Sequence, residues 1–388
     1  MDVTQFNLRH LNAALQIFDR GSISAAAQAV NLTQPAITQG LAKLETQLAI
    51  MLFERTSAGM QATEAMDLLA PRITAALESI GSSRVTMAQM RAFLAVAEYG
   101  SYPLASASTG LAPPTLHRAV NDLGLALKRS LFERRGKGLS LTVYGRRLVR
   151  SLRLARTELI AALSEISALK GSEVGEISIG AMPLSRARFL PHIVGQFYRE
   201  HPEIRIKIVE GSHAELIEPL RDGEVDFLIG ALRDPGPGDD VQQKALFEDQ
   251  PVVIARAGHP LTVDQSSGGP AIKDLSQYPW IIAAPGTPLR GQWQDMFRHG
   301  GLEPPVIPIE CGSVITIRQI LMESDFLTLL SPDQVAVELE ANWLVTIGEG
   351  PQGLKRTIGI STRTGWRPTM LQLQFIDMMH QYATGMNS

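Results

Sequence analysis

The chain has 388 residues, of which 45% are hydrophobic and 19% are charged, which is enough for two or three folded domains and unlike the composition of a disordered protein. Its first residues lack a signal peptide, no run approaches the ~20 apolar residues of a membrane span, and the single cysteine, Cys311, excludes an internal disulfide and a cysteine-based zinc cluster. The net charge of −3 hides an uneven distribution, because residues 84–171 hold 14 basic and 5 acidic side chains while residues 172–388 hold 17 and 27. We therefore expect a cytoplasmic protein without membrane partner, metal or cofactor. We also expect the basic segment to bind a polyanion, although solvated surface charge alone remains an alternative explanation.

The first half of the chain contains one sequence unit twice. Residues 11–69 align with residues 90–148 at a constant offset of 79 without a gap, and 16 of the 59 aligned positions are identical, against about four expected by chance. Apolar periodicity and cap residues predict the same elements in each copy: three helices joined by short turns, followed by a short hairpin.

The third helix of the first copy begins Thr-Gln-Pro. Thr33 can cap it, and Gln34 and Pro35 fall in its first turn, where proline replaces no intrahelical hydrogen bond. The inner face carries a core stripe, and the outer face carries a short polar row made of Gln34, Thr38, Gln39 and Lys43. Such a row fits the major groove of DNA, although an ordinary solvated helix face would explain it equally well by itself.

The hairpins of the two copies differ in charge. In "LFERTSAGMQAT" Arg55 stands at the base of a neutral hairpin, whereas "LFERRGKGLSLT" carries Arg134, Arg135 and Lys137. Basic hairpins of this kind commonly contact phosphates. A long helix follows the second copy, and its apolar residues between 146 and 168 have nearly heptad spacing.

From residue 176 onward, strands such as "EISIGA" and "DFLTLLS" alternate with helices such as "RARFLPHIVGQFYREHP". Alternation of this kind predicts a parallel sheet with helices on both faces. Its repetition predicts two α/β lobes, between which the chain crosses near residues 256–260 and 347–350.

The segments "GSISAAAQAVNLTQPAITQGLAKLE" and "LFER" resemble the N-terminal domain of LysR-type transcriptional regulators. The segments "GAMPLSRARFLPHIVGQFYREHPEIRIKIVEG" and "LIEPLRDGEVDFLIG" resemble the effector-binding domain of the same family, so that the resemblance covers nearly the whole chain. It implies a winged helix-turn-helix that reads operator DNA, a linker helix that pairs two subunits, and a bilobal domain with the fold of periplasmic solute-binding proteins.

The tandem copies are a departure from the family, and a dimer would carry four winged units. Copy one keeps the third helix of the family pattern, and copy two keeps Gly145 and the basic hairpin. We expect copy one to read bases, and copy two to hold phosphates and anchor the dimer. Two alternatives stay open: copy two is a decayed spacer, or copy one is a regulatory lid.

The expected fold class is multidomain, with a mainly α tandem winged helix-turn-helix region, a linker helix and an α/β bilobal effector domain. The expected domains are residues 1–83 (copy one), 84–145 (copy two), 146–171 (linker and dimerisation helix) and 172–388 (effector binding), the last with lobe I at about 176–255 and 350–388 and lobe II at about 256–349.

The family pattern assigns two groups of residues. The expected DNA-binding residues are Thr33, Gln34, Pro35, Ala36, Thr38, Gln39, Lys43, Arg55, Thr115, His117, Arg118, Arg134, Arg135 and Lys137. By analogy, the expected effector-binding residues are Met182, Pro183, Ser185, Gly230, Ala231, Thr287 and Ser313, although each hydroxyl among them could equally be a helix cap. Arg186, Arg188 and Arg290 could pair with a carboxylate of the effector, although solvation at the surface is the more frequent fate of an arginine.

We therefore expect a sequence-specific transcriptional regulator controlled by a small molecule, with an aromatic acid or a sugar-type catabolite as the effector. The expected partners are double-stranded operator DNA, this effector, further copies of the chain as a homodimer or homotetramer, and RNA polymerase. The sequence has no nucleophile-elbow, Walker or zinc-protease motif, so we expect no enzyme. The alternative is a solute-binding or metabolic protein whose N-terminal units serve only as assembly modules.

Overall fold

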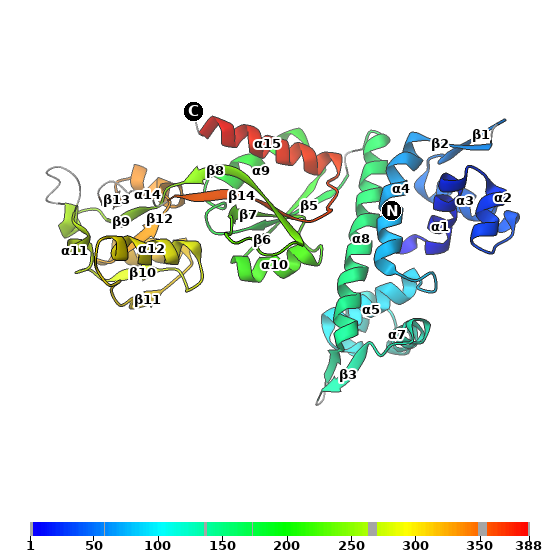
Figure 1. Cartoon of the computed structure of the whole chain (residues 1–388), viewed down its shortest axis with the longest axis horizontal. Helices are drawn as coiled ribbons and strands as arrows, with labels where there is room; N and C mark the ends of the chain where they lie inside the picture. Colours follow the sequence, from blue (N-terminus) through cyan, green and yellow to red (C-terminus); the bar gives the residue numbers. More distant parts are fainter. Residues whose placement is uncertain are drawn as a thin grey trace.

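The computed structural model describes residues 3–57, 59–135, 138–172, 174–262, 270–347 and 355–386. Figure 1 shows a pair of long helices, α4 and α8, with small helical units on one side and two α/β lobes on the other. The two units and the helix pair share one hydrophobic core, and the lobes have cores of their own.

The first helical unit has the elements expected from the sequence. Asn7, Ser22 and Thr33 cap its first three helices, each side chain accepting a hydrogen bond from a backbone amide in the first turn. A short 3-10 helix, η1 (Val3–Gln5), precedes them. The unit consists of α1 (Leu8–Arg20), α2 (Ile23–Ala29), α3 (Gln34–Leu48), the hairpin β1 (Phe53–Thr56) and β2 (Gly59–Ala62), and α4 (Glu64–Ile80).

The second unit repeats this order. Thr86 and Ser101 cap its first two helices, but Ala112, before the third, offers no side-chain hydrogen bond. The unit consists of α5 (Met87–Tyr99), α6 (Tyr102–Thr109), α7 (Pro113–Leu127), the hairpin β3 (Phe132–Arg135) and β4 (Gly138–Leu141), and the long helix α8 (Val143–Leu169).

Helices α4 and α8 pack against each other along their length. They run in opposite directions, since α4 starts beside the β1–β2 hairpin and α8 starts at the far end beside β3 (Figure 1). Both apolar stripes are buried; that of α8 contains Leu148, Leu152, Ala155, Leu159, Ala162 and Ile166. The stripe that the sequence predicted to pair two subunits is therefore covered by α4 of the same chain.

The first lobe is built on a five-stranded sheet. The strand order is β6 (Arg205–Glu210), β5 (Glu176–Ala181), β7 (Phe227–Ala231), β14 (Arg356–Arg363) and β8 (Val241–Asp249). Its helices are α9 (Phe189–Glu200), α10 (His213–Arg221) and the C-terminal α15 (Met370–Met386).

The second lobe has a sheet of the same size. Its strand order is β11 (Ile309–Glu310), β10 (Trp280–Ile282), β12 (Leu327–Leu330), β9 (Val252–Arg256) and β13 (Leu344–Thr346). Its helices are α11 (Ile272–Leu275), α12 (Pro288–His299), α13 (Val314–Met322) and α14 (Ala336–Glu340), with 3-10 turns η2 (Pro260–Thr262) and η3 (Pro332–Val335).

The expectation of a parallel sheet is correct for three strands of each lobe and wrong for the other two. β5, β6 and β7 are parallel, as are β10, β11 and β12, but β14 runs antiparallel to β7 and β8, and β9 runs antiparallel to β12 and β13. The antiparallel strands β8, β9, β13 and β14 are the ones that flank the two passages between lobes. The first passage lies between Asp249 and Val252, before the expected residues 256–260; the second follows Thr346, where residues 348–354 lie outside the described part.

Candidate nucleic-acid interface and effector cavity

The start of α3 faces solvent. The expected contact residues of this helix (Thr33, Gln34, Pro35, Ala36, Thr38, Gln39 and Lys43) are all exposed, whereas Ile37, Leu41 and Leu44 are buried beneath them. Gln34 Nε2 donates to Ser24 Oγ (3.1 Å) and Thr38 Oγ1 donates to the Gln34 carbonyl (3.0 Å), so α2 and α3 hold the polar row in place. The polar row therefore lies on the outside of the unit, as DNA contact requires.

The first hairpin is tied to α3. The Glu45 carboxylate accepts from the backbone amides of Leu52 (2.8 Å) and Phe53 (3.4 Å), and Thr63 Oγ1 donates to the Met51 carbonyl (2.8 Å). Arg55 is exposed on β1. The hairpin thus has a fixed position relative to the polar row.

The second unit presents a different helix surface. Thr115, His117 and Arg118 are exposed on α7. The His117 ring packs on Tyr102 with ring centroids 5.1 Å apart, and His117 Nδ1 is 3.1 Å from Asn121 Nδ2. Arg118 keeps 86% of its side-chain surface exposed. These side chains are therefore available to a ligand on the same face that α3 uses in the first unit.

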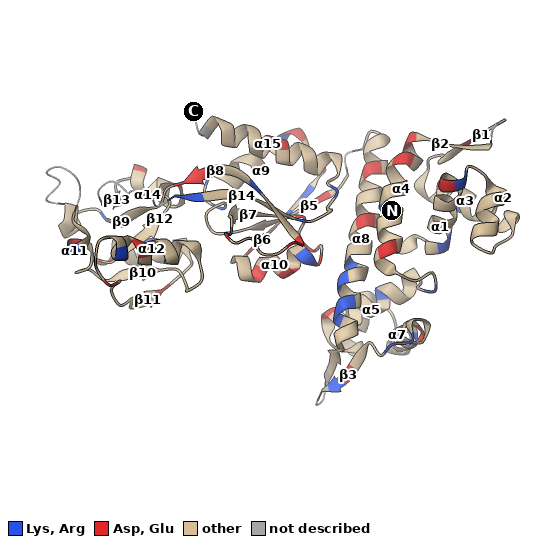
Figure 2. Cartoon of the chain, in the orientation of Figure 1, with Lys and Arg blue, Asp and Glu red and all other residues tan. Residues whose placement is uncertain are grey.

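Only some of the basic side chains of the second unit and of α8 are without an acidic partner among the described residues. In Figure 2 the ribbon is coloured blue, for Lys and Arg, at β3 and along the adjoining half of α8. Arg134 is exposed on β3; Arg135 also lies on β3, but its side chain and the whole of Lys137 lie outside the described residues. On α8, Arg150 pairs with Asp240 (3.2 Å) and Arg153 with Asp222 (3.0 Å), both in the first lobe. Part of the charge asymmetry thus fastens α8 to this lobe, and the rest is concentrated at the hairpin end.

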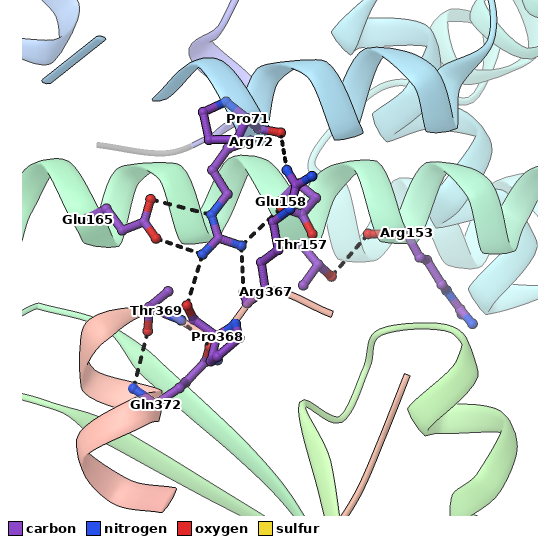
Figure 3. A network of polar contacts seen from close by, with 10 residues as sticks. All are labelled: Pro71, Arg72, Arg153, Thr157, Glu158, Glu165, Arg367, Pro368, Thr369 and Gln372. Atoms are coloured by element: carbon purple, nitrogen blue, oxygen red, sulfur yellow. Dashed lines mark hydrogen bonds and ion pairs between the residues drawn. The ribbon is translucent and has the colours of Figure 1, made fainter. Parts of the chain in front are cut away.

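A buried polar cluster joins the helix pair to the first lobe (Figure 3). Arg72 of α4 is only 4% exposed, and its guanidinium donates to Glu165 Oε1 (2.6 Å) and Glu158 Oε2 (3.1 Å) of α8 and to the carbonyls of Arg367 (2.6 Å) and Pro368 (3.2 Å), just before α15. Burial alone would lower the pKa of Arg72, but the hydrogen bond to Glu165 and the two nearby carboxylates raise it. The cation therefore stays charged while it bridges three elements.

A cavity of about 210 Å³ lies between the two lobes. Most of its lining is apolar, with Leu184 from the first lobe and Leu289, Val314 and Ile317 from the second. Four of the expected effector-binding residues line it: Met182, Pro183, Ala231 and Thr287. Thr287 also caps α12: its hydroxyl accepts from the Arg290 amide (3.3 Å) and donates to the Ala284 carbonyl (3.0 Å).

Three expected effector residues lie outside this lining. Ser185 is fully buried and its hydroxyl donates to the carbonyls of Met182 (2.8 Å) and Ile229 (3.1 Å). Gly230 is covered by Met182, which a Cβ at this position would meet at 2.5 Å. Ser313 caps α13 and borders a separate, more open hollow. The hydroxyls of Ser185 and Ser313 thus bond to the backbone, and Gly230 makes room for Met182.

The cationic groups of the cavity were not predicted. Arg186, Arg188 and Arg290 are each paired with a glutamate, respectively Glu210, Glu340 and Glu310. The lining itself contains His213, Arg233 and Arg356, of which Arg356 pairs through Nε with Asp249 (2.6 Å). His213 Nε2, Arg233 Nε and Arg356 Nη2 are buried nitrogens without a hydrogen-bond partner among the described residues. Burial lowers the pKa of Arg233, and burial followed by the charges of Arg233 and Arg221 lowers the pKa of His213. Nitrogen donors left unpaired in this way fit an anionic ligand.

Two classes of site are not found in the described part of the chain. No helix there is both long and apolar enough to cross a membrane. Nowhere among the same residues do three or more histidine, cysteine, aspartate or glutamate side chains gather as metal ligands would.

Comparison with known proteins agrees with this geometry. The family described as "Bacterial regulatory helix-turn-helix protein, lysR family" matches twice, at residues 8–66 and 87–146, and "LysR substrate binding domain" matches residues 170–384. The HTH-type transcriptional regulator GalR of Pseudomonas putida is 30% identical over 378 residues, covering 94% of each chain. PcaQ of Agrobacterium fabrum, also an HTH-type transcriptional regulator, is 25% identical over 74% of this chain and 91% of its own.

Solved structures show the same fold. A full-length OxyR variant from Pseudomonas aeruginosa superposes with a TM-score of 0.57 at 21% identity, over 76% of this chain and 93% of its own. CbnR, a LysR family transcriptional regulator, gives a TM-score of 0.54 at 18% identity, over 76% and 98%. With both domain types matched and one relative aligned along nearly its whole length, this chain belongs to the LysR family of bacterial transcriptional regulators.

Proposed function

We propose that the chain is a cytoplasmic transcriptional regulator that carries two winged helix-turn-helix heads and is switched by a small organic acid bound between its lobes. LysR-family regulators are not enzymes; they bind operator DNA and a small-molecule effector and assemble with copies of themselves. RNA polymerase completes the proposed set of partners.

The proposal of two heads is supported by the repeated order of elements and by the double match to the helix-turn-helix family. The P. putida relative supports it as well: an alignment over 94% of this chain has to include both units. In each unit the third helix turns its polar residues to solvent.

The observation that carries the choice of an acid is the group of unpaired nitrogens on Arg233, Arg356 and His213 around an apolar cavity. A carboxylate would accept hydrogen bonds from these nitrogens, and an aromatic or aliphatic body would fill the apolar remainder. A sugar would leave its many hydroxyl groups facing apolar side chains, which is unfavourable. Within the two classes expected from the sequence, we therefore favour the aromatic acid.

Matched acid and amide probes test this choice. We expect benzoate to raise the melting temperature of the full chain and to bind at least tenfold more tightly than benzamide, because only the acid carries the charge that the arginines would pair with. Isothermal titration calorimetry measures both affinities. Equal binding of acid and amide would contradict an anionic effector.

The binding of an acid should also depend on pH through His213. Its lowered pKa makes it neutral at pH 7 in the free protein. A carboxylate in the cavity would favour the protonated ring, so binding takes up a proton and becomes tighter as pH falls from 7 toward 5. Calorimetric titrations in two buffers of different ionisation enthalpy measure the proton uptake on binding. His213→Asn should abolish this uptake. Weaker binding of benzoate by the unaltered chain at pH 6 than at pH 7 would refute the role of His213.

Two substitutions separate base reading from phosphate binding. Gln34→Ala should lower discrimination between operator and random duplex, since a glutamine amide can pair with an adenine edge. Arg134→Ala should weaken binding to every duplex and reduce the salt dependence, because it removes one phosphate contact. Fluorescence anisotropy at several salt concentrations measures both; equal losses on operator and random duplex from both variants would contradict the assignment.

A further inference from the structure

We propose that a single chain reads an operator made of two unlike half-sites, one with each head. This inference rests on the proposed function, namely that both heads bind DNA. It adds the nature of the DNA partner: two different short sequences at fixed spacing, in place of an inverted repeat.

The first support is the symmetry of the interface between α4 and α8. Five positions that are buried on α4 correspond, at the same offset of 79, to buried positions on α8: Leu69 and Leu148, Ala70 and Val149, Ile73 and Leu152, Ala76 and Ala155, Ile80 and Leu159. An interface in which equivalent residues of two copies face each other in opposite directions is the pattern of a twofold dimer. Here one chain supplies both halves.

The second support is the position of the heads. Because α4 and α8 run in opposite directions, the two units lie toward opposite ends of the helix pair, as the two heads of a dimer would (Figure 1). Lys170 Nζ, just beyond the end of α8, donates to the Leu48 carbonyl at the end of α3 (3.1 Å). The first unit is thus held by the end of the helix that follows the second unit.

The third support is the divergence of the two reading faces. The positions beneath them stay apolar and buried, Ile37 and Leu41 in α3 matching Leu116 and Val120 in α7. All four positions of the outward row differ: Gln34 is replaced by Pro113, Thr38 by His117, Gln39 by Arg118 and Lys43 by Asp122. Base-edge preferences follow side-chain type, glutamine pairing with adenine and arginine with guanine.

These three observations together determine the kind of DNA. A dimer of identical heads reads a palindrome because the symmetry of the protein is matched by that of the DNA. This chain keeps the twofold scaffold but has two different readers, so its operator has two different blocks. A second chain is not needed to supply the second head, since the apolar stripe of α8 is already covered by α4.

Selection from a library of random duplexes of about four helical turns, using the full chain, tests this directly. We expect the enriched duplexes to contain two blocks of different sequence at constant spacing. Gln39→Ala should reduce discrimination in one block by about tenfold and leave the other unchanged, and Arg118→Ala should do the reverse. Thr38→Ala and His117→Ala provide a second pair, and a melting curve of each variant shows that it is folded.

The number of chains on one selected duplex, measured by mass photometry at low concentration, completes the test; one chain per pair of blocks is expected. Any of four results would overturn this inference. The selected blocks could be identical and inverted, or two chains could occupy one pair of blocks. Substitutions in both heads could affect the same block, or duplexes could be retained without sequence enrichment. Failure to retain any duplex would instead overturn the proposed function.

Discussion

Replacing Arg72 by alanine should lower the free energy of unfolding by about 3 kcal/mol, the cost of leaving buried carboxylates without their cation. The side chains of Glu158 and Glu165 are only 17% and 11% exposed, and Arg72 is the cation that pairs with both. The carbonyls of Arg367 and Pro368 would lose a donor as well. Urea unfolding followed by circular dichroism measures the change.

The same substitution should weaken the coupling between the lobes and the heads, although the pairs of Arg150 and Arg153 with the first lobe stay in place. Arg72 bonds both to α8 and to the segment that leads into α15, so a movement of the first lobe reaches the helix pair through this cluster (Figure 3). We expect Arg72→Met combined with Glu158→Gln and Glu165→Gln to recover most of the stability, because no buried charge is then left unpaired. This triple variant should still bind benzoate and DNA, but benzoate should no longer change its affinity for DNA.

The matched control is Arg156→Ala, which removes an exposed arginine from the same helix pair. A surface change of this kind shifts stability by less than about 0.5 kcal/mol. Should Arg72→Ala and Arg156→Ala unfold at the same urea concentration, the cluster would not stabilise the junction; should the triple variant keep its full response to benzoate, coupling would run by another route.

The helical units could be predicted well because their signals are local. The cap residues Ser22 and Thr33, the apolar spacing of α3 and the offset of 79 are all visible in the sequence, and the structure has these elements. The partner of α8 was not predictable in this way. An apolar stripe such as Leu152, Ala155 and Leu159 indicates that something covers it, but the choice between a second subunit and α4 depends on tertiary structure.

The C-terminal half shows the same limit. β8 was not predicted as a strand, since its sequence "VQQKALFED" is polar and its neighbour β14 lies more than a hundred residues away along the chain. The cationic groups of the cavity were missed for a related reason. Arg186 and Arg290 lie next to recognisable loops but meet glutamates. Arg233 and Arg356, the latter also paired with Asp249, stand near strand ends that only the fold brings together.

Arg233→Met should therefore remove the response to an acid without harming the fold. Across the described residues Arg233 forms no ion pair; its one guanidinium hydrogen bond found there runs from Nη1 to the Gly286 carbonyl of the second lobe (3.2 Å), and its Nε is buried and unpaired. Methionine keeps the apolar stem, so we expect stability equal to or slightly above that of the unaltered chain. The affinity for benzoate should fall about 30-fold, the loss that accompanies one charge-assisted pair.

Arg298→Met is the appropriate control, because Arg298 forms an exposed pair with Asp295 on α12 (3.4 Å) and is not part of the cavity lining. It should leave benzoate binding unchanged. Arg72 and Arg233 are thus expected to give opposite results. Loss of Arg72 lowers the melting temperature, whereas loss of Arg233 lowers only the affinity for the acid. If Arg233→Met unfolded more easily and still bound benzoate as the unaltered chain does, Arg233 would be a brace between the lobes, and the anion would have to bind elsewhere.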